Sequence, residues 1–342
     1  MPAVSPGGAL RSLRRTEVSA LPAALAKIEA VCGHCNDREF QVRLNAYRAI
    51  VAHQRGEAVR GLARSSAEAT IELNELVRVL RFDVARIVVK DYVATWPKVP
   101  QLLTQATLYG TSGDIEDQFR DEPTADVQVI AKPGASTTFV VFCGIRHQFG
   151  INLNVLHHCW LAKYGANIVY LRDFSEALYL SGIRSLGYVE ETVDALRATF
   201  ASLGTQRLIC IGNSAGVFGC LYYAVRLNAE LALCFSGPSS LDIGLEFTEK
   251  QSYRRIQDLH QQGKAHWPNL RDLYRQHADV RASLHFGDQN VADRKQAENL
   301  AGPPNVSLHP LHGISRHFII DQLVRMGVFQ DALASAARFN PG

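Results

Sequence analysis

The sequence predicts an α/β fold, in which a mainly parallel sheet is flanked by helices and preceded by an α-helical N-terminal region. From about residue 138 onward, short apolar runs alternate with helix-like segments, which is typical of parallel strands joined by helical crossovers. Before about residue 105, apolar residues recur every three or four positions, which indicates helices. In addition, the stretch 212–216 lies between a strand-like run and a helix-like run.

The N-terminal third of the chain has two segments that differ in composition. Residues 1–19 are rich in Pro, Gly, Ser and Arg, and we expect them to be flexible. Residues 20–123 are expected to form a helical region that ends in a linker or surface loop from about residue 110. Within it, Ser65 and Glu68 have the spacing of a capping box, which predicts a helix start.

Residues 124–342 are expected to form the α/β domain. The rhythm of strands and helices is interrupted at about 246–279, a polar and helix-prone stretch for which we expect a cap-like helical insertion over the site. Five apolar residues of this stretch could cover the site: Tyr253, Leu259, Trp267, Leu270 and Tyr274. A helical excursion that packs elsewhere is the alternative. The expected strands are 126–131, 138–143, 167–171, 207–211, 231–235, 281–286 and 305–309, and a last helix is expected from about His317.

Composition excludes some classes of function. The 342 residues carry a net charge of +3 without a long basic block, so nucleic acid is not the expected partner. No uncharged apolar stretch has the length of a membrane span or of a secretory signal, so we expect a cytoplasmic protein. The seven cysteines are an odd number and lie mostly in apolar segments, which favours reduced thiols. We expect no cofactor and no metal site.

The stretch Gly212-Asn213-Ser214-Ala215-Gly216 has the pattern Gly-x-Ser-x-Gly in a strand–turn–helix setting. A serine on such a sharp turn takes a strained conformation and exposes its hydroxyl above the sheet. The glycines let the strand and the helix approach closely, and the helix N-terminus offers free N–H groups. The pattern therefore indicates Ser214 as a nucleophile, and an ordinary serine in a tight turn is the alternative.

A serine hydroxyl needs a base that takes its proton, and a histidine held by an acid supplies one. His317 follows the last expected strand, and Asp288 and Asp293 follow the strand before it. Loop reach favours Asp293 over Asp288 by a narrow margin, and Asp242, after the preceding strand, is a third candidate. Each of these acids could instead be a surface carboxylate or a helix cap. Two other histidines remain alternatives for the base: His309 and His312.

The order Ser…Asp…His, the stretch 212–216 and the Gly–acid loop 287–293 resemble the α/β-hydrolase superfamily. The resemblance covers about three-fifths of the chain, from about residue 138 to 333, and points to no subfamily. It implies an α/β-hydrolase-type sheet and a Ser–His–acid catalytic triad that acts through an acyl-enzyme. One departure is that a position where members often carry the acid holds Asn290 here.

Two backbone N–H groups are expected to form an oxyanion hole. One belongs to Ala215, directly after the nucleophile, and the other to Ile145, in the loop after strand 138–143. Arg146 and His147 follow Ile145, so they would lie at the rim of the site. There they would bind an anionic part of a substrate or remain solvated.

Arg172 is a further candidate for substrate binding, because it follows the strand 167–171. An ion pair with the neighbouring Asp173 is the alternative.

Together these features predict a serine hydrolase that cleaves a carboxylic ester or a thioester, on a small molecule or on a carrier. If the acyl acceptor is an alcohol or an amine instead of water, the same triad makes an acyltransferase. A third hypothesis is an interaction protein, in which the helical region 20–123 binds a protein partner or a second copy and the hydrolase domain has little activity.

Overall fold

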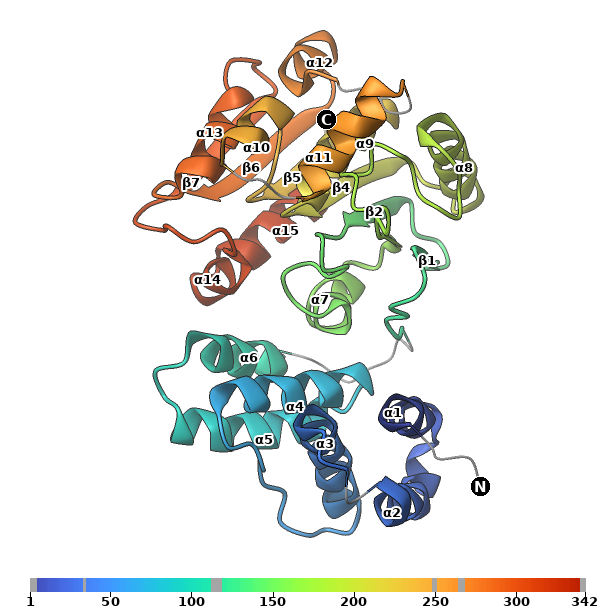
Figure 1. The fold of residues 1–342 in the computed structure, drawn as a ribbon. Coiled ribbons are helices and arrows are strands. Elements are labelled where there is room, and N and C mark those ends of the chain that lie inside the picture. The colour runs from blue at the N-terminus through green and yellow to red at the C-terminus, as the bar shows by residue number, and fades with distance from the viewer. Residues whose placement is uncertain (1–4, 33–34, 112–118, 248–250, 264–267, 339–342) are drawn as a thin grey trace. The chain divides into compact units, whose positions relative to one another are not determined.

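The computed structural model describes residues 5–32, 35–111, 119–247, 251–263 and 268–338 (Figure 1). The chain divides into two compact units. The first, a helical unit, comprises Met1–Asp121 and His157–Cys159, and the second, an α/β unit, comprises Glu122–Leu156 and Trp160–Gly342.

Among its described residues, the helical unit contains helices and no strand. Their apolar faces supply its core, with Phe40, Leu73 and Val88 among the fully or almost fully buried side chains. At the expected helix start, the Oγ of Ser65 accepts a hydrogen bond from the N–H of Glu68 at 3.2 Å, which confirms the predicted cap. The elements are α1 (Pro6–Arg15), the short helix η1 (Val18–Ala20), α2 (Leu21–Cys32), α3 (Arg38–Gln54), α4 (Ser66–Arg78), α5 (Phe82–Thr95) and α6 (Pro100–Thr111).

The expectation of a flexible N-terminus to residue 19 is wrong for most of that segment. Pro6–Arg15 form α1, whose N-terminus is capped by the Oγ of Ser5. Proline is favoured at the first position of a helix, which explains Pro6. The side chains of Leu10 and Leu13 are buried in the helical unit. The Pro- and Gly-rich composition masked this short amphipathic pattern. Of the linker expected from about residue 110, residues 112–118 lie outside the described residues, and 110–111 belong to α6.

Two buried glutamates lie in α4. Glu75 accepts hydrogen bonds from the Nε of Arg14 at 2.7 Å and from the hydroxyl of Tyr47 at 2.8 Å. Glu72 accepts one from the hydroxyl of Tyr92 at 2.6 Å. Burial raises the pKa of Glu72 to about 7, because the loss of water disfavours the charged carboxylate more than the bond from Tyr92 favours it.

This shift predicts a pH-dependent stability. The native Glu72 keeps its proton up to about pH 7 whereas the unfolded one releases it near 4.5, so the free energy of unfolding should fall as the pH rises through that window. The contribution amounts to about 3 kcal/mol. Urea unfolding of Glu72→Gln from about pH 4 to about pH 8 should lack this component. Equal pH profiles of variant and wild type would contradict the prediction.

The α/β unit is built on a seven-stranded sheet with the strand order β1-β3-β2-β4-β5-β6-β7 (Figure 1). All neighbouring strands are parallel except β1, which pairs antiparallel with β3. The predicted architecture is confirmed: a mainly parallel sheet flanked by helices, with a helical region before it. The strands are β1 (Val127–Ile130), β2 (Thr137–Phe142), β3 (Asn167–Leu171), β4 (Arg207–Asn213), β5 (Leu231–Phe235), β6 (Arg281–Gly287) and β7 (Val306–Leu311).

Helices cover both faces of this sheet. α8, α9, α12 and α13 share one apolar core with the strands, and α15 packs on β5 from the other face, with Phe329 against Phe235. In the described part of the chain, no helix has the length and apolar character needed to cross a membrane. The helices are α7 (Leu153–Cys159), η2 (Leu161–Tyr164), α8 (Val189–Ser202), α9 (Gly216–Arg226), α10 (Leu241–Phe247), α11 (Gln251–Gln261), α12 (Leu270–Gln276), α13 (Val291–Asn299), α14 (Ile320–Arg325) and α15 (Val328–Arg338).

The expected cap-like insertion at about 246–279 contains the end of α10, all of α11 and all of α12, and two of its residues do not cover a site. Leu270 and Tyr274 of α12 are fully buried in the core on the α9 side of the sheet. The hydroxyl of Tyr274 donates to the carbonyl of Leu221 in α9 at 3.2 Å. The apolar face of α12 therefore extends the helical layer, and the expectation for these two residues is wrong. Trp267 lies outside the described residues.

Candidate functional site

The turn between β4 and α9 has the conformation expected of a nucleophile elbow. Ser214 has φ 53°, a left-handed conformation that costs a non-glycine residue about 1–2 kcal/mol. Its N–H donates to the carbonyl of Phe235 at the end of β5, at 3.0 Å, and this bond helps to hold the strained turn. β4 ends at Asn213 and α9 begins at Gly216, so Ser214 lies at the carboxyl edge of the sheet.

Any side chain in place of Gly216 is expected to clash with neighbouring backbone. A Cβ at this position would lie 2.2 Å from the carbonyl oxygen of Phe142 and 2.8 Å from that of Cys143, both in backbone that cannot move aside easily. We expect Gly216→Ala to lower the free energy of unfolding by about 3 kcal/mol in urea titrations. Gly204→Ala is the control, because its Cβ would meet nothing and only the positive φ costs about 1 kcal/mol. Equal losses in both variants would contradict this close approach.

Three of the predicted residues form a chain of hydrogen bonds. The Oγ of Ser214 lies 2.8 Å from the Nε2 of His317. The Nδ1 of His317 lies 2.8 and 3.0 Å from the two carboxylate oxygens of Asp293. Because a carboxylate only accepts, Nδ1 carries the proton, and Nε2 is left to accept the hydrogen of the Ser214 hydroxyl. This is the arrangement that a general base needs to activate a serine.

Asp293 and His317 have different surroundings. Asp293 is 5 % exposed, in the first turn of α13. The helix cap that the sequence allowed for Asp293 is supplied by Asn290, whose side chain accepts from the N–H of Asp293 at 3.1 Å. The carboxylate is thus left for His317, which lies in the loop before α14 and does not open a helix as expected. Burial, and to a lesser extent the charge of Asp293, raises the pKa of Tyr253 in α11 to about 12.

Asp288 binds a different histidine. Its Oδ2 lies 2.9 Å from the Nδ1 of His312, and its Oδ1 accepts from the N–H of Gly313 at 2.9 Å. These bonds hold the pKa of Asp288 below its usual value and tie the loop after β6 to the loop that leads to His317. The structure therefore does not bring Asp288 to His317, and His312 does not face Ser214. Asp242 is exposed in α10.

The loop after β2 lies beside the elbow. A Cβ on Gly144 would lie 3.3 Å from the Cβ of Ser214 and 3.2 Å from the carbonyl oxygen of Asn213, so the loop approaches as closely as a glycine allows. The next N–H, that of Ile145, and the N–H of Ala215 have no hydrogen-bond acceptor in the described part of the chain. Both donors remain available for an oxyanion at Ser214.

The three predicted substrate-binding residues have different environments. Arg146 is exposed, next to Ile145. His147 is half-buried with its ring centre 4.5 Å from that of Phe174, and burial lowers its pKa, so it is neutral near pH 7. Arg172 is fully buried and donates to backbone carbonyls, so it is not placed to touch a substrate, and the prediction for it is wrong.

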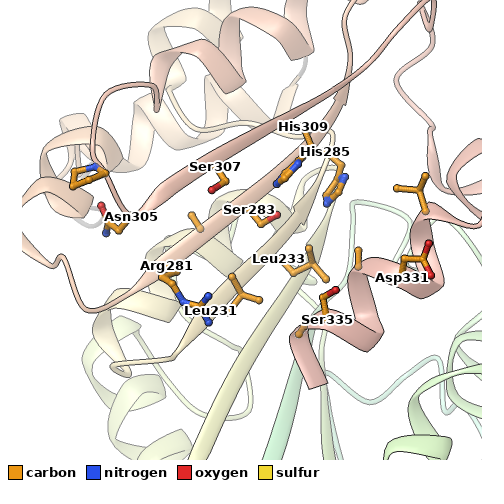
Figure 2. A pocket seen from close by; sticks show the side chains of 15 residues that line it. Leu231, Leu233, Arg281, Ser283, His285, Asn305, Ser307, His309, Asp331 and Ser335 are labelled. Atoms are coloured by element: carbon orange, nitrogen blue, oxygen red, sulfur yellow. The ribbon is translucent and has the colours of Figure 1, made fainter. Parts of the chain in front are cut away.

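A cavity of about 450 Å³ opens elsewhere, between strands β5–β7 and α15 (Figure 2). Ser214, Asp293 and His317 are not among its lining residues. The rings of His285 and His309 stack in it with centres 4.6 Å apart, and Asp331 of α15 also lines the cavity. Burial lowers the pKa of His285 to about 3 and also lowers that of His309. His309, an alternative base in the sequence, therefore belongs to this cavity.

Sequence analysis missed two residues that support the site. The hydroxyl of Tyr179 donates to the carbonyls of Cys143 and Leu171, each at 2.9 Å, and so joins the ends of β2 and β3. The carboxylate of Asp173 accepts from the N–H groups of Ala177 and Tyr179 at 2.7 and 2.9 Å, which holds the loop after β3. Asp173 comes two residues after a buried strand, and this position suggested a pocket lining or an ion pair with Arg172 but no role in holding the loop.

Comparisons with known proteins locate similar folds. No protein-family model and no curated protein matches the chain. Among solved structures, it is similar to a carboxylesterase from the thaumarchaeon Nitrososphaera gargenis (12 % identity, 62 % of this chain and 94 % of the other, TM-score 0.41). It is also similar to MGS-MChE2, an α/β hydrolase from a lagoon-sediment metagenome (15 % identity, 64 % and 97 %, TM-score 0.43).

A third similar structure is the capsule O-acetyltransferase of Neisseria meningitidis serogroup A (12 % identity, 61 % and 92 %, TM-score 0.44). These likenesses are too distant to transfer an activity or a substrate to this chain.

Proposed function

We propose that this protein is a serine hydrolase that cleaves a carboxylic ester or thioester through an acyl-enzyme on Ser214. The observation that carries the proposal is the unbroken hydrogen-bond chain from Asp293 through His317 to the strained Ser214. A surface serine in an ordinary turn would need neither the positive φ nor a histidine whose second nitrogen binds a buried carboxylate.

In the first step, the Oγ of Ser214 attacks the acyl carbon while the Nε2 of His317 takes the hydroxyl proton. The carbonyl oxygen becomes an oxyanion, which accepts hydrogen bonds from the N–H groups of Ala215 and Ile145. His317 then gives its proton to the leaving alcohol or thiol as the carbon–oxygen or carbon–sulfur bond breaks. Asp293 keeps the imidazole oriented and stabilises its protonated form.

In the second step, an acceptor attacks the acyl-enzyme by the same route. His317 takes a proton from the acceptor, the acyl carbon–Oγ bond breaks, and Ser214 recovers its hydrogen. Water as the acceptor gives hydrolysis, and an alcohol or an amine gives acyl transfer. Arg146, exposed beside the oxyanion loop, is proposed to contact an anionic part of the substrate, with the neutral His147 next to it.

The test is a panel of p-nitrophenyl esters and acyl thioesters, assayed with and without a primary alcohol or amine. We expect release of p-nitrophenol or thiol that disappears in His317→Ala. If added acceptor takes up the acyl group in place of water, the protein is an acyltransferase. If the folded wild type and His317→Ala are equally inactive over the whole panel, the hydrolase proposal fails in favour of an interaction protein.

A further inference from the structure

The loop that carries Ile145 is a tight turn held at both ends. The N–H of His147 donates to the carbonyl of Gly144 at 2.8 Å, and the N–H of Gly144 donates to the carbonyl of Gln148 at 2.9 Å. Neither bond uses the N–H of Ile145, which has no acceptor among the described residues. The direction of this N–H depends on the shape of the turn, because the turn sets the orientation of its peptide plane.

The turn contains a strained residue. His147 has φ 57°, a left-handed conformation that a non-glycine residue keeps only when its surroundings impose it. Its ring packs on Phe174, as described above, and its carbonyl accepts a hydrogen bond from the Nε of Arg172 at 3.1 Å. Arg172 therefore binds the strained residue of the turn. Without this contact, the backbone of His147 could relax to an unstrained conformation.

Arg172 joins this turn to two other segments. Its Nη1 donates to the carbonyl of Ala125 at 2.8 Å and to the Oε1 of Gln128 at 3.2 Å. Its own N–H donates to the carbonyl of Asp126 at 2.8 Å. Because Arg172 directly follows β3 and Gln128 lies in β1, a single buried guanidinium links the edge of the sheet to the turn beside Ser214. Burying a charge is costly, so its neighbours must bind it closely.

We propose that Arg172 is a positioning residue for the oxyanion hole: by holding the carbonyl of His147, it fixes the turn 144–148 so that the N–H of Ile145 points at the oxyanion. The proposal rests on the serine hydrolase activity proposed for Ser214. Such an interaction matters in the transition state and hardly at all in substrate binding, because the negative charge on the oxygen develops only during the reaction.

The test compares Arg172→Met and Arg172→Lys with wild type, using the best p-nitrophenyl ester of the panel and a trifluoromethyl ketone of the same acyl chain. The ketone adds to Ser214 and forms a stable oxyanion, so its affinity reports on the oxyanion hole. We expect kcat and kcat/KM of Arg172→Met to fall together by about 100-fold, with the ketone bound about 100-fold more weakly and KM changed little.

Arg172→Lys should recover part of this loss, because an ammonium group can still donate to the carbonyl of His147 but cannot bridge all three segments. Arg184→Met is the matched control, because this arginine is 69 % exposed and lies over the ring of Phe174 without binding the turn. It should keep wild-type kinetics. Thermal unfolding of each variant verifies that the folded protein is compared.

A loss in kcat without a matching loss in ketone affinity, or a rise in KM alone, would overturn the positioning role. So would wild-type kinetics in Arg172→Met, or a failure of both Arg172 variants to fold, since Arg172 would then serve stability. A wild type that neither turns over esters nor binds the ketone would refute the hydrolase proposal itself, which separates the two failures.

Discussion

Ser214→Ala is expected to lower the turnover of the best ester substrate by about 10⁴- to 10⁶-fold, to the level of the reaction without an acyl-enzyme. The hydroxyl is the group that bonds to the acyl carbon, and its hydrogen bond to His317 at 2.8 Å marks the route of its proton. An alanine fits the turn without added atoms, so the fold and KM should change little.

Ser236→Ala is the matched control for this experiment. Ser236 follows β5 as Ser214 follows β4, it also has a positive φ, at 40°, and its buried Oγ has no hydrogen-bond partner in the described part of the chain. We expect its turnover to stay within about threefold of wild type, as for a substitution that breaks no interaction. If Ser214→Ala keeps a tenth or more of the activity while remaining folded, Ser214 is not the nucleophile.

Asp293→Asn is expected to lower kcat by about 10⁴-fold while the protein stays folded. An amide in place of the carboxylate can offer its N–H₂ to the Nδ1 of His317, which favours the tautomer with the proton on Nε2. That tautomer cannot accept the hydrogen of Ser214, and the imidazolium formed during the reaction loses its counter-charge. Steady-state kinetics over the ester panel measures the effect.

Asp288→Asn provides an unusually close control, because Asp288 follows the same strand and also binds the Nδ1 of a histidine. Its partner His312 is 87 % exposed at its side chain, and exposed pairs contribute about 1 kcal/mol or less, so we expect a change of less than about tenfold. A larger loss in Asp288→Asn than in Asp293→Asn would reverse the assignment of the acid.

Much of the site could be predicted because its chemistry constrains the local sequence. The elbow needs glycines on both sides of Ser214, since a Cβ on Gly216 would strike the backbone of β2. Parallel strands buried on both faces are continuous apolar runs, so β3 and β5 have the expected bounds. Asp293 follows β6 and His317 follows β7, so their order after Ser214 could be seen in the sequence.

Other features depend on contacts between residues distant in the sequence, which a local pattern does not contain. Loop reach favoured Asp293 over Asp288 only narrowly, because the choice also depends on Asn290 taking the helix cap. Arg172 looked like a pocket residue because it follows a strand, but the segments packed around it, β1 among them, bury it fully. The same holds for α12, whose apolar face fits the helical layer as well as it would fit a cap.

The most direct test of the account is the reaction of the folded wild-type protein with a fluorophosphonate, followed by intact-mass and peptide-mapping mass spectrometry. A serine activated by His317 and Asp293 should acquire one adduct, on Ser214, which is absent in Ser214→Ala and forms far more slowly in His317→Ala. No adduct on the folded wild type, an adduct on another residue, or an equal rate in His317→Ala would contradict the proposed function.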